Sequence, residues 1–164
     1  PKATRETLDH SIMYIFTVAL QDGKWHHEHS YSPERAQRKD TVELWNKITT
    51  VEDEKWTTLY HHTDPNKKAF GAKVIITLND GTQIIDEIER ANAHPGGAKP
   101  FVRENYVQKF KTLTDDIIDQ EESNRFLNLV SKLKNLCAEE VKQLNVQVDL
   151  NWLKESKPND RGIF

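Results

Sequence analysis

The feature that most constrains the fold is a β-hairpin signature in the middle of the chain. β-Branched side chains are frequent in residues 72–78, and isoleucines recur in residues 83–88. The sequence NDGT at positions 79–82 separates the two runs. β-Branched side chains favour strands, and an Asp-Gly pair tolerates the positive φ angles of tight hairpin turns. These residues therefore predict two antiparallel strands with Asp80-Gly81 at the tip.

A stretch rich in proline and glycine follows the hairpin. Residues 93–100 read AHPGGAKP, and this composition interrupts both helical and strand hydrogen bonding. Beyond it, apolar residues return at helical spacing in residues 102–113 and 126–137, which predicts helices. We expect three segments along the chain: an α+β portion (1–93), a connecting loop (94–101) and a C-terminal helical segment (102–164).

The N-terminal residues predict one buried helix. Thr4 is a candidate N-cap, Asp22-Gly23 ends the segment, and residues 4–20 carry apolar side chains at helical spacing. The predicted apolar stripe consists of Leu8, Ile12, Ile15, Phe16 and Ala19.

The next residues are less regular. Residues 24–39 are polar, contain Pro33 and lack periodicity, so they predict a long surface connection. Asp40 is a candidate cap for a short helix, and the β-branched residues 48–51 predict a strand. Helices around a small sheet define an α+β fold.

Composition excludes several classes of protein. The 164 residues include 23 Lys and Arg against 26 Asp and Glu, a net charge of −3, which argues against a nucleic-acid partner. No apolar run is long enough to span a membrane. The single cysteine, Cys137, excludes an internal disulfide, and its apolar neighbours predict a core position. Because the chain begins with Pro1, we expect it to be trimmed or part of a longer protein.

Histidines suggest a metal site only weakly. In a strand, His27 and His29 of the sequence HHEH at positions 26–29 would share one face. Their spacing matches no common zinc pattern, and Cys137 is far away in the sequence. We therefore expect a surface loop here and predict no metal and no cofactor.

Two candidate binding regions remain. His94 and Lys99 flank the tight Pro-Gly loop, where an imidazole and an ammonium can meet a carboxylate ligand; alternatively, its glycines only let the chain turn. His10 and Tyr14 share a helix face at i and i+4 and could line a cleft, whereas the alternative is a histidine bonded within its own domain. Asp9, His10 and Ser11 cannot form a catalytic relay, because neighbours on a helix point about 100° apart.

Five segments of the chain form a series with a fixed order and spacing. They are TRETLDHSIMY (4–14), KITTVED (47–53), LNDGT (78–82), AHPGGAKP (93–100) and KF (109–110). Together these segments resemble the C-terminal portion of the MmgE/PrpD family. The resemblance extends from about residue 3 to residue 164, and it is carried by the series rather than by any one motif.

The resemblance implies a dehydratase of propionate catabolism that converts 2-methylcitrate into 2-methylaconitate and water without an iron–sulfur cluster. It also implies a homodimer, in which this chain supplies much of an α+β lid and then helices that return to a larger helical domain lying upstream. We expect a cytoplasmic protein, with a mitochondrial location as the alternative. By its position in the family pattern, His94 would help to bind or protonate the tricarboxylate. From their own chemistry we expect Lys99, His10 and Tyr14 to contact it, although many relatives carry Phe at the place of His10.

Other functions remain open at this point. The same fold is compatible with decarboxylation of an aconitate-like acid or with epimerisation of a dicarboxylate. A chain of this length could also be a non-catalytic α+β module that binds a ligand or partner.

Overall fold

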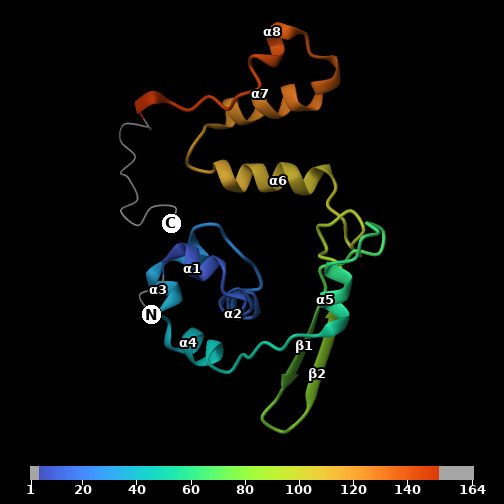
Figure 1. Cartoon of the computed structure of the whole chain (residues 1–164). Coiled ribbons are helices and arrows are strands. Elements are labelled where there is room, and N and C mark those ends of the chain that lie inside the picture. The colour runs from blue at the N-terminus through green and yellow to red at the C-terminus, as the bar shows by residue number, and fades with distance from the viewer. Residues whose placement is uncertain (1–3, 152–164) are drawn as a thin grey trace. The chain divides into compact units, whose positions relative to one another are not determined.

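The computed structural model describes residues 4–151, whose α-helices and strands are labelled in Figure 1. The chain divides into two compact units. The helical unit comprises Pro1–Thr50 and Lys111–Phe164, and the hairpin unit comprises Val51–Phe110. The described residues contain eight α-helices, two short 3₁₀ helices and one two-stranded antiparallel sheet, so the predicted α+β class is confirmed. The division into segments 1–93, 94–101 and 102–164 stays a prediction.

The N-terminal helix prediction was partly wrong, because two helices stand where one was expected. Helix α1 spans Arg5–Asp9 and begins at the predicted cap, Thr4, whose side chain accepts the Thr7 N–H. Helix α2 spans Ile12–Asp22 and has its own cap, Ser11, which accepts the Tyr14 N–H. Gly23 ends α2 in the left-handed region at φ 66°, as its sequence position predicted.

The buried face of α2 also differs from the predicted stripe. Tyr14, Thr17 and Val18 are the buried residues of the helix, whereas Ile12 is 59% exposed. Leu8 and Ala36 complete the core with Tyr14 and Val18, and Tyr31 packs against it. The break between α1 and α2 changes the helical phase, so a stripe counted from Leu8 through the break selects the wrong residues.

Residues 24–50 are more ordered than expected. The 3₁₀ helix η1 spans His29–Tyr31, α3 spans Pro33–Ala36, and α4 spans Lys39–Trp45. The missed signal for α3 is Ser32-Pro33, a cap followed by proline at the first helical position; the Ser32 hydroxyl accepts the Arg35 N–H. Helix α4 was predicted, but Asp40 lies inside it and Arg38 takes the N-cap position.

The predicted strand at residues 48–51 is absent. These residues form no helix or strand, and Val51 is 89% exposed. β-Branched side chains favour a strand only where a partner strand supplies hydrogen bonds and packing.

The hairpin prediction is confirmed in both strands and in the turn. Strands β1 (Ala72–Thr77) and β2 (Gln83–Ile88) pair antiparallel, and Ile75 lies opposite Ile85. Gly81 adopts φ 85°, and its N–H donates to the Leu78 carbonyl at 3.0 Å. Asp80 does not adopt a positive φ. Its role in the turn is its carboxylate, which accepts the Thr82 N–H at 2.9 Å.

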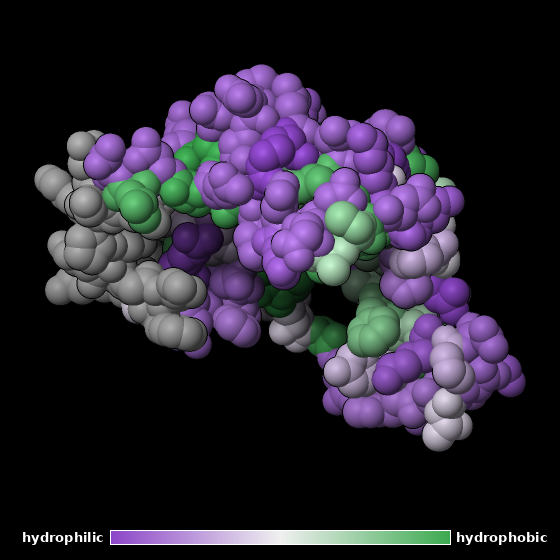
Figure 2. All heavy atoms as spheres, turned by 90° about the horizontal axis from the view of Figure 1, so that it is seen from above, coloured by the Kyte–Doolittle hydropathy of each residue, from purple (hydrophilic) through white to green (hydrophobic). Residues whose placement is uncertain are grey.

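Both strands of the hairpin carry exposed isoleucines. Ile75 is 52% exposed, and Ile84 and Ile85 are 51% and 55% exposed. Apolar side chains also reach the surface between polar ones on the face shown in Figure 2. Ala69 is the one buried apolar residue described in the hairpin unit. The sheet therefore rests on backbone pairing and cross-strand contact more than on a core.

Helix α5, Glu54–Tyr60, precedes the hairpin within the same unit. Its N-cap is Asp53, whose carboxylate accepts the Lys55 N–H. The Trp56 ring lies so close to Gly71 that a Cβ there would be 2.0 Å from a ring carbon, so only glycine leaves room for the indole. The predicted turn at residues 64–66 is present.

Helices are present in both predicted regions of the C-terminal segment, although the second begins earlier than predicted and ends at Ser131. The elements of this segment are α6 (Arg103–Thr114), α7 (Gln120–Ser131), η2 (Leu133–Asn135) and α8 (Ala138–Val141). The core prediction for Cys137 was wrong: the residue is exposed and stands at the N-cap of α8, where its N–H donates to the Glu140 carboxylate. None of the helices in residues 4–151 combines the length and apolar character needed to cross a bilayer.

Candidate functional site

The loop that follows β2 is a succession of tight turns around His94. The His94 N–H donates to the Ala91 carbonyl at 2.9 Å, and the Gly97 N–H donates to the His94 carbonyl at 2.8 Å. The Phe101 N–H donates to the Ala93 carbonyl at 3.4 Å. The loop is thus a shaped element rather than a slack connection, and it presents His94 at the surface.

The ring of His94 is oriented by its own backbone. Nδ1 accepts the Gly96 N–H at 3.0 Å. A nitrogen that accepts a backbone proton carries no proton itself, so the neutral ring holds its proton on Nε2. The exposed imidazole therefore offers Nε2 to a ligand.

The two glycines of the loop are required for space and not for unusual dihedral angles. Neither Gly96 nor Gly97 has a positive φ. A Cβ on Gly97 would lie 2.2 Å from the Ala91 carbonyl oxygen, and a Cβ on Gly96 would lie 2.7 Å from Nη1 of Arg90. Gly97 therefore faces a backbone carbonyl that excludes a side chain, whereas a side chain at Gly96 would have to displace the end of the Arg90 side chain.

Arg90 is a neighbour of the loop that sequence reasoning missed. Its Nη2 donates to the carbonyls of Asn66 at 2.7 Å and Lys68 at 3.4 Å, so the side chain connects the segment before β1 to the His94 loop. The only signal in the sequence is its position four residues before His94. Lys99 is exposed, and within residues 4–151 it forms no hydrogen bond or ion pair with His94.

His10 lies at the C-terminal end of α1 and is exposed. Its Nδ1 lies 2.9 Å from the Glu6 carbonyl oxygen, which can only accept, so Nδ1 carries the proton. The ring thereby caps the helix end and leaves Nε2 as an acceptor.

Tyr14 is a buried core residue rather than a surface group. It is 3% exposed, and its hydroxyl donates to the Ser30 carbonyl at 2.6 Å. Burial raises the pKa of the phenol, which keeps the hydroxyl protonated. The structure does not pair Tyr14 with His10, because the helix breaks between them.

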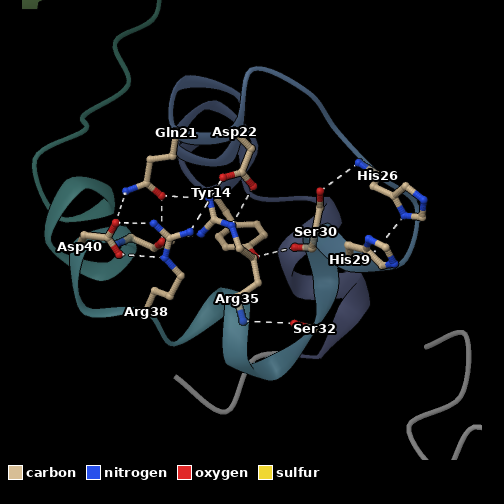
Figure 3. A network of polar contacts seen from close by, with 11 residues as sticks. Tyr14, Gln21, Asp22, His26, His29, Ser30, Ser32, Arg35, Arg38 and Asp40 are labelled. Carbon is tan, nitrogen blue, oxygen red and sulfur yellow. Dashed lines mark hydrogen bonds and ion pairs between the residues drawn. The ribbon is translucent and has the colours of Figure 1, made fainter.

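The strongest polar network surrounds Arg35 and was also missed by sequence reasoning (Figure 3). The guanidinium donates to both carboxylate oxygens of Asp22, at 2.8 and 3.1 Å, and to Gln21 at 2.9 Å. Thr41 donates to the same Gln21 oxygen at 2.8 Å. The Arg35 hydrogen bonds hold the pKa of Asp22 below its usual value. These contacts join α2, α3 and α4, so the network is structural.

The histidines at positions 26–29 serve the local backbone. The His26 ring stacks on those of His27 and His29, with centroids 4.5 and 4.1 Å apart, and its Nδ1 accepts the N–H groups of Glu28 and His29. Burial and the neighbouring His29 and His27 lower the pKa of His26. Within the part of the chain that is described, no group of three or more His, Cys, Asp or Glu side chains is placed to hold a metal ion.

Comparison with known proteins defines the class. The MmgE/PrpD C-terminal domain matches residues 1–135, so the chain belongs to the MmgE/PrpD family. It is similar to the "Probable 2-methylcitrate dehydratase" of Saccharomyces cerevisiae, at 33% identity over 146 residues. That alignment covers 86% of this chain and 26% of the yeast protein, so the chain spans about a quarter of the length of this relative.

Proposed function

We propose that this chain forms the C-terminal part of a dehydratase that removes water from 2-methylcitrate to give 2-methylaconitate. The observation that carries the proposal is the exposed His94, whose ring is oriented by Gly96 and keeps Nε2 for a ligand. Membership of the MmgE/PrpD family and the yeast relative's name support the choice of reaction.

The reaction removes a proton and a hydroxide from adjacent carbons of a tricarboxylate. It requires a base near the acidic C–H, an acid for the departing hydroxyl, and cations or hydrogen-bond donors for the carboxylates. His94 can donate the Nε2 proton to the leaving oxygen or to a substrate carboxylate. We assign the base to the upstream part of the full-length protein.

The other candidate residues contribute unequally to this proposal. Lys99 supplies an exposed ammonium five residues after His94, suited to a carboxylate. His10 retains an acceptor at Nε2 and stays a proposed substrate contact. Tyr14 is better explained as a core residue, because its hydroxyl is already bonded to Ser30 in a buried position.

The proposal includes the setting of the enzyme. A helical domain upstream would complete the active site, and the full-length protein would act as a cytoplasmic homodimer. We therefore expect the 164-residue chain to be catalytically silent alone.

The first experiment follows the ultraviolet absorbance of the unsaturated product formed from 2-methylcitrate. The 164-residue chain and the full-length protein are compared side by side. We expect activity only in the full-length protein. Activity in neither would favour decarboxylation, epimerisation or a binding role, which assays with aconitate-like acids and dicarboxylates would separate. Activity in the chain alone would contradict the assignment of the base to upstream residues.

The second experiment changes His94 in the full-length protein. We expect His94→Ala to lower kcat/KM by at least about tenfold, or roughly 1.4 kcal/mol of transition-state stabilisation. His62→Ala is a matched control. Nδ1 of His62 accepts the N–H of Asp64, two residues later, at 2.9 Å, just as Nδ1 of His94 accepts the N–H of Gly96. Equal activity of the two variants would remove His94 from the site.

A further inference from the structure

The side chain of Arg90 connects two loops of the hairpin unit. Its side chain is 23% exposed, and Nη2 is bonded to the carbonyls of Asn66 and Lys68 at 2.7 and 3.4 Å. Nε is buried without a hydrogen bond in the described residues; the Glu89 carboxylate lies 3.7 Å away, beyond hydrogen-bonding distance. The guanidinium is thus tethered at Nη2 by two solvent-exposed hydrogen bonds, while its Nε end is buried.

The other end of the guanidinium lies against the turn that orients His94. A Cβ on Gly96 would stand 2.7 Å from Nη1 of Arg90 and 3.5 Å from Nδ1 of His94. The guanidinium, the Gly96 backbone and the imidazole are therefore immediate neighbours. The bond from the Gly96 N–H to Nδ1 is exposed, so water competes for both groups. A tethered neighbour that limits the movement of Gly96 would help to keep the donor in place.

We propose that Arg90 is a positioning residue for His94: packed against Gly96, it keeps the Gly96 N–H on Nδ1 and so leaves the protonated Nε2 for the substrate. The catalytic consequence rests on the proposed function, whereas the effect on the His94 ring does not. Gly96 is the residue that allows this contact, because any Cβ at this position would displace the guanidinium from its observed place. Gly97 differs, because its missing side chain makes room for the Ala91 carbonyl.

The direct test is ¹⁵N NMR of the histidine rings in the 164-residue chain. We expect His94 of the unmodified chain to show the proton on Nε2, and Arg90→Ala to give a mixture of both tautomers. His26 in the helical unit makes a similar Nδ1 bond to the Glu28 N–H and serves as reference in the same spectrum. Arg103→Ala, which removes an arginine from the start of α6, is the matched control.

Gly96→Ala tests the same contact without removing the arginine. The methyl group should displace the guanidinium and give the same tautomer mixture. In the Arg90→Ala background that methyl group meets no guanidinium, so the double variant should resemble Arg90→Ala alone. A His94 tautomer unchanged in either single variant would overturn the proposal. So would a double variant whose effect is the sum of two separate effects, because Gly96→Ala would then act on the turn directly.

Kinetics of the full-length protein separate this inference from the proposed function. We expect Arg90→Ala to lower kcat by about tenfold, with a smaller change in KM, because a misplaced catalytic group mainly weakens the transition state. Arg90→Lys keeps the charge without the planar fork and should recover only part of the rate. An unchanged kcat beside an active parent overturns the inference alone. A shifted tautomer beside an inactive parent leaves the positioning intact and overturns the proposed function.

Discussion

The helical unit and the hairpin unit are stabilised in different ways. Near its N-terminus the helical unit buries the side chains of Leu8, Tyr14, Val18 and Ala36 together, and the Arg35 network ties three helices beside them. The hairpin unit has the clearer sequence signal but exposes most side chains of both strands. A strong local signal thus fixes the backbone geometry, whereas burial depends on residues distant in sequence.

The comparison predicts that equivalent truncations have unequal effects in the two units. Tyr14→Ala should lower the free energy of opening of the helical unit by about 3 kcal/mol, because it removes a buried ring and leaves a cavity. Ile85→Ala should cost the hairpin unit less than about 1 kcal/mol, because Ile85 is 55% exposed. Residue-resolved amide exchange measures both quantities in one sample.

A second variant separates the Tyr14 ring from its hydroxyl. Tyr14→Phe keeps the packing and should cost about 1 kcal/mol, because the Ser30 carbonyl loses its donor. Equal losses for Tyr14→Ala and Ile85→Ala would contradict the proposed difference between the units.

The next largest effect should come from Asp22 and should depend on pH. We expect Asp22→Asn to cost about 1.5 kcal/mol at pH 7, since the Arg35 guanidinium loses a charged partner. The Arg35 hydrogen bond lowers the pKa of Asp22 from 3.8. Its stabilisation is therefore complete above that value and is lost as the pH falls through the lowered pKa.

Urea unfolding at several pH values tests this prediction. The difference between the unmodified chain and Asp22→Asn should shrink on acidification. Asp86→Asn on β2 is the control, because the described contact of the Asp86 carboxylate is the N–H of the next residue. A difference that stays constant down to pH 2 would show that the charge of Asp22 is unimportant.

Two glycines allow the same local strain to be compared in both units. Gly23 and Gly81 have φ values of 66° and 85°, and no atom lies within 4 Å of a Cβ at either position. Alanine at each position should therefore cost about 1 kcal/mol through the backbone alone. Amide exchange of α2 and of the hairpin gives the two values. A much larger loss at one position would mean that its unit depends on that turn for more than local geometry.

The smallest expected effect on stability is the pH dependence that His26 contributes. Burial and the adjacent His29 and His27 lower its pKa from 6.5, so protonation opposes folding. Stability should decrease as the pH falls through 6.5, because the unfolded chain then binds the proton more readily. His26→Ala should remove this dependence from the amide exchange of η1. In the control variant His61→Ala, the same pH dependence of η1 exchange should remain. If it also remained in His26→Ala, the dependence would belong to another group.

Sequence patterns predicted the elements whose geometry is local. The hairpin turn follows from Asp80 and Gly81, the start of α1 from Thr4, and the end of α2 from Gly23. The patterns failed where the structure of a segment depends on contacts that the local sequence does not determine. Residues 48–51 have strand composition but no partner strand, and the phase of α2 depends on a break that Ser11 introduces.

The candidate site was predictable only in part. Proline and glycine marked the loop, and His94 was the residue in it whose side chain can both donate and accept a hydrogen bond. The hydrogen bond from the Gly96 N–H to Nδ1 of His94 and the contact of Arg90 with Gly96 depend on the folded loop, and no sequence pattern indicates them. Tyr14 is the opposite case: its hydroxyl has chemistry suited to a binding site, but the residue is buried in the core.

The geometry of Arg35 also bears on how natural variants of this chain should be interpreted. A lysine in its place would count as conservative in any substitution table, yet its three donors diverge from one nitrogen and cannot reproduce a planar fork. The two oxygens of Asp22 and the amide oxygen of Gln21 would lose matched donors. Arg38 also donates through two nitrogens to the Asp40 carboxylate, but its side chain is 45% exposed, so water can replace the lost donors and the same exchange should cost less there. The same substitution therefore has unequal consequences three residues apart.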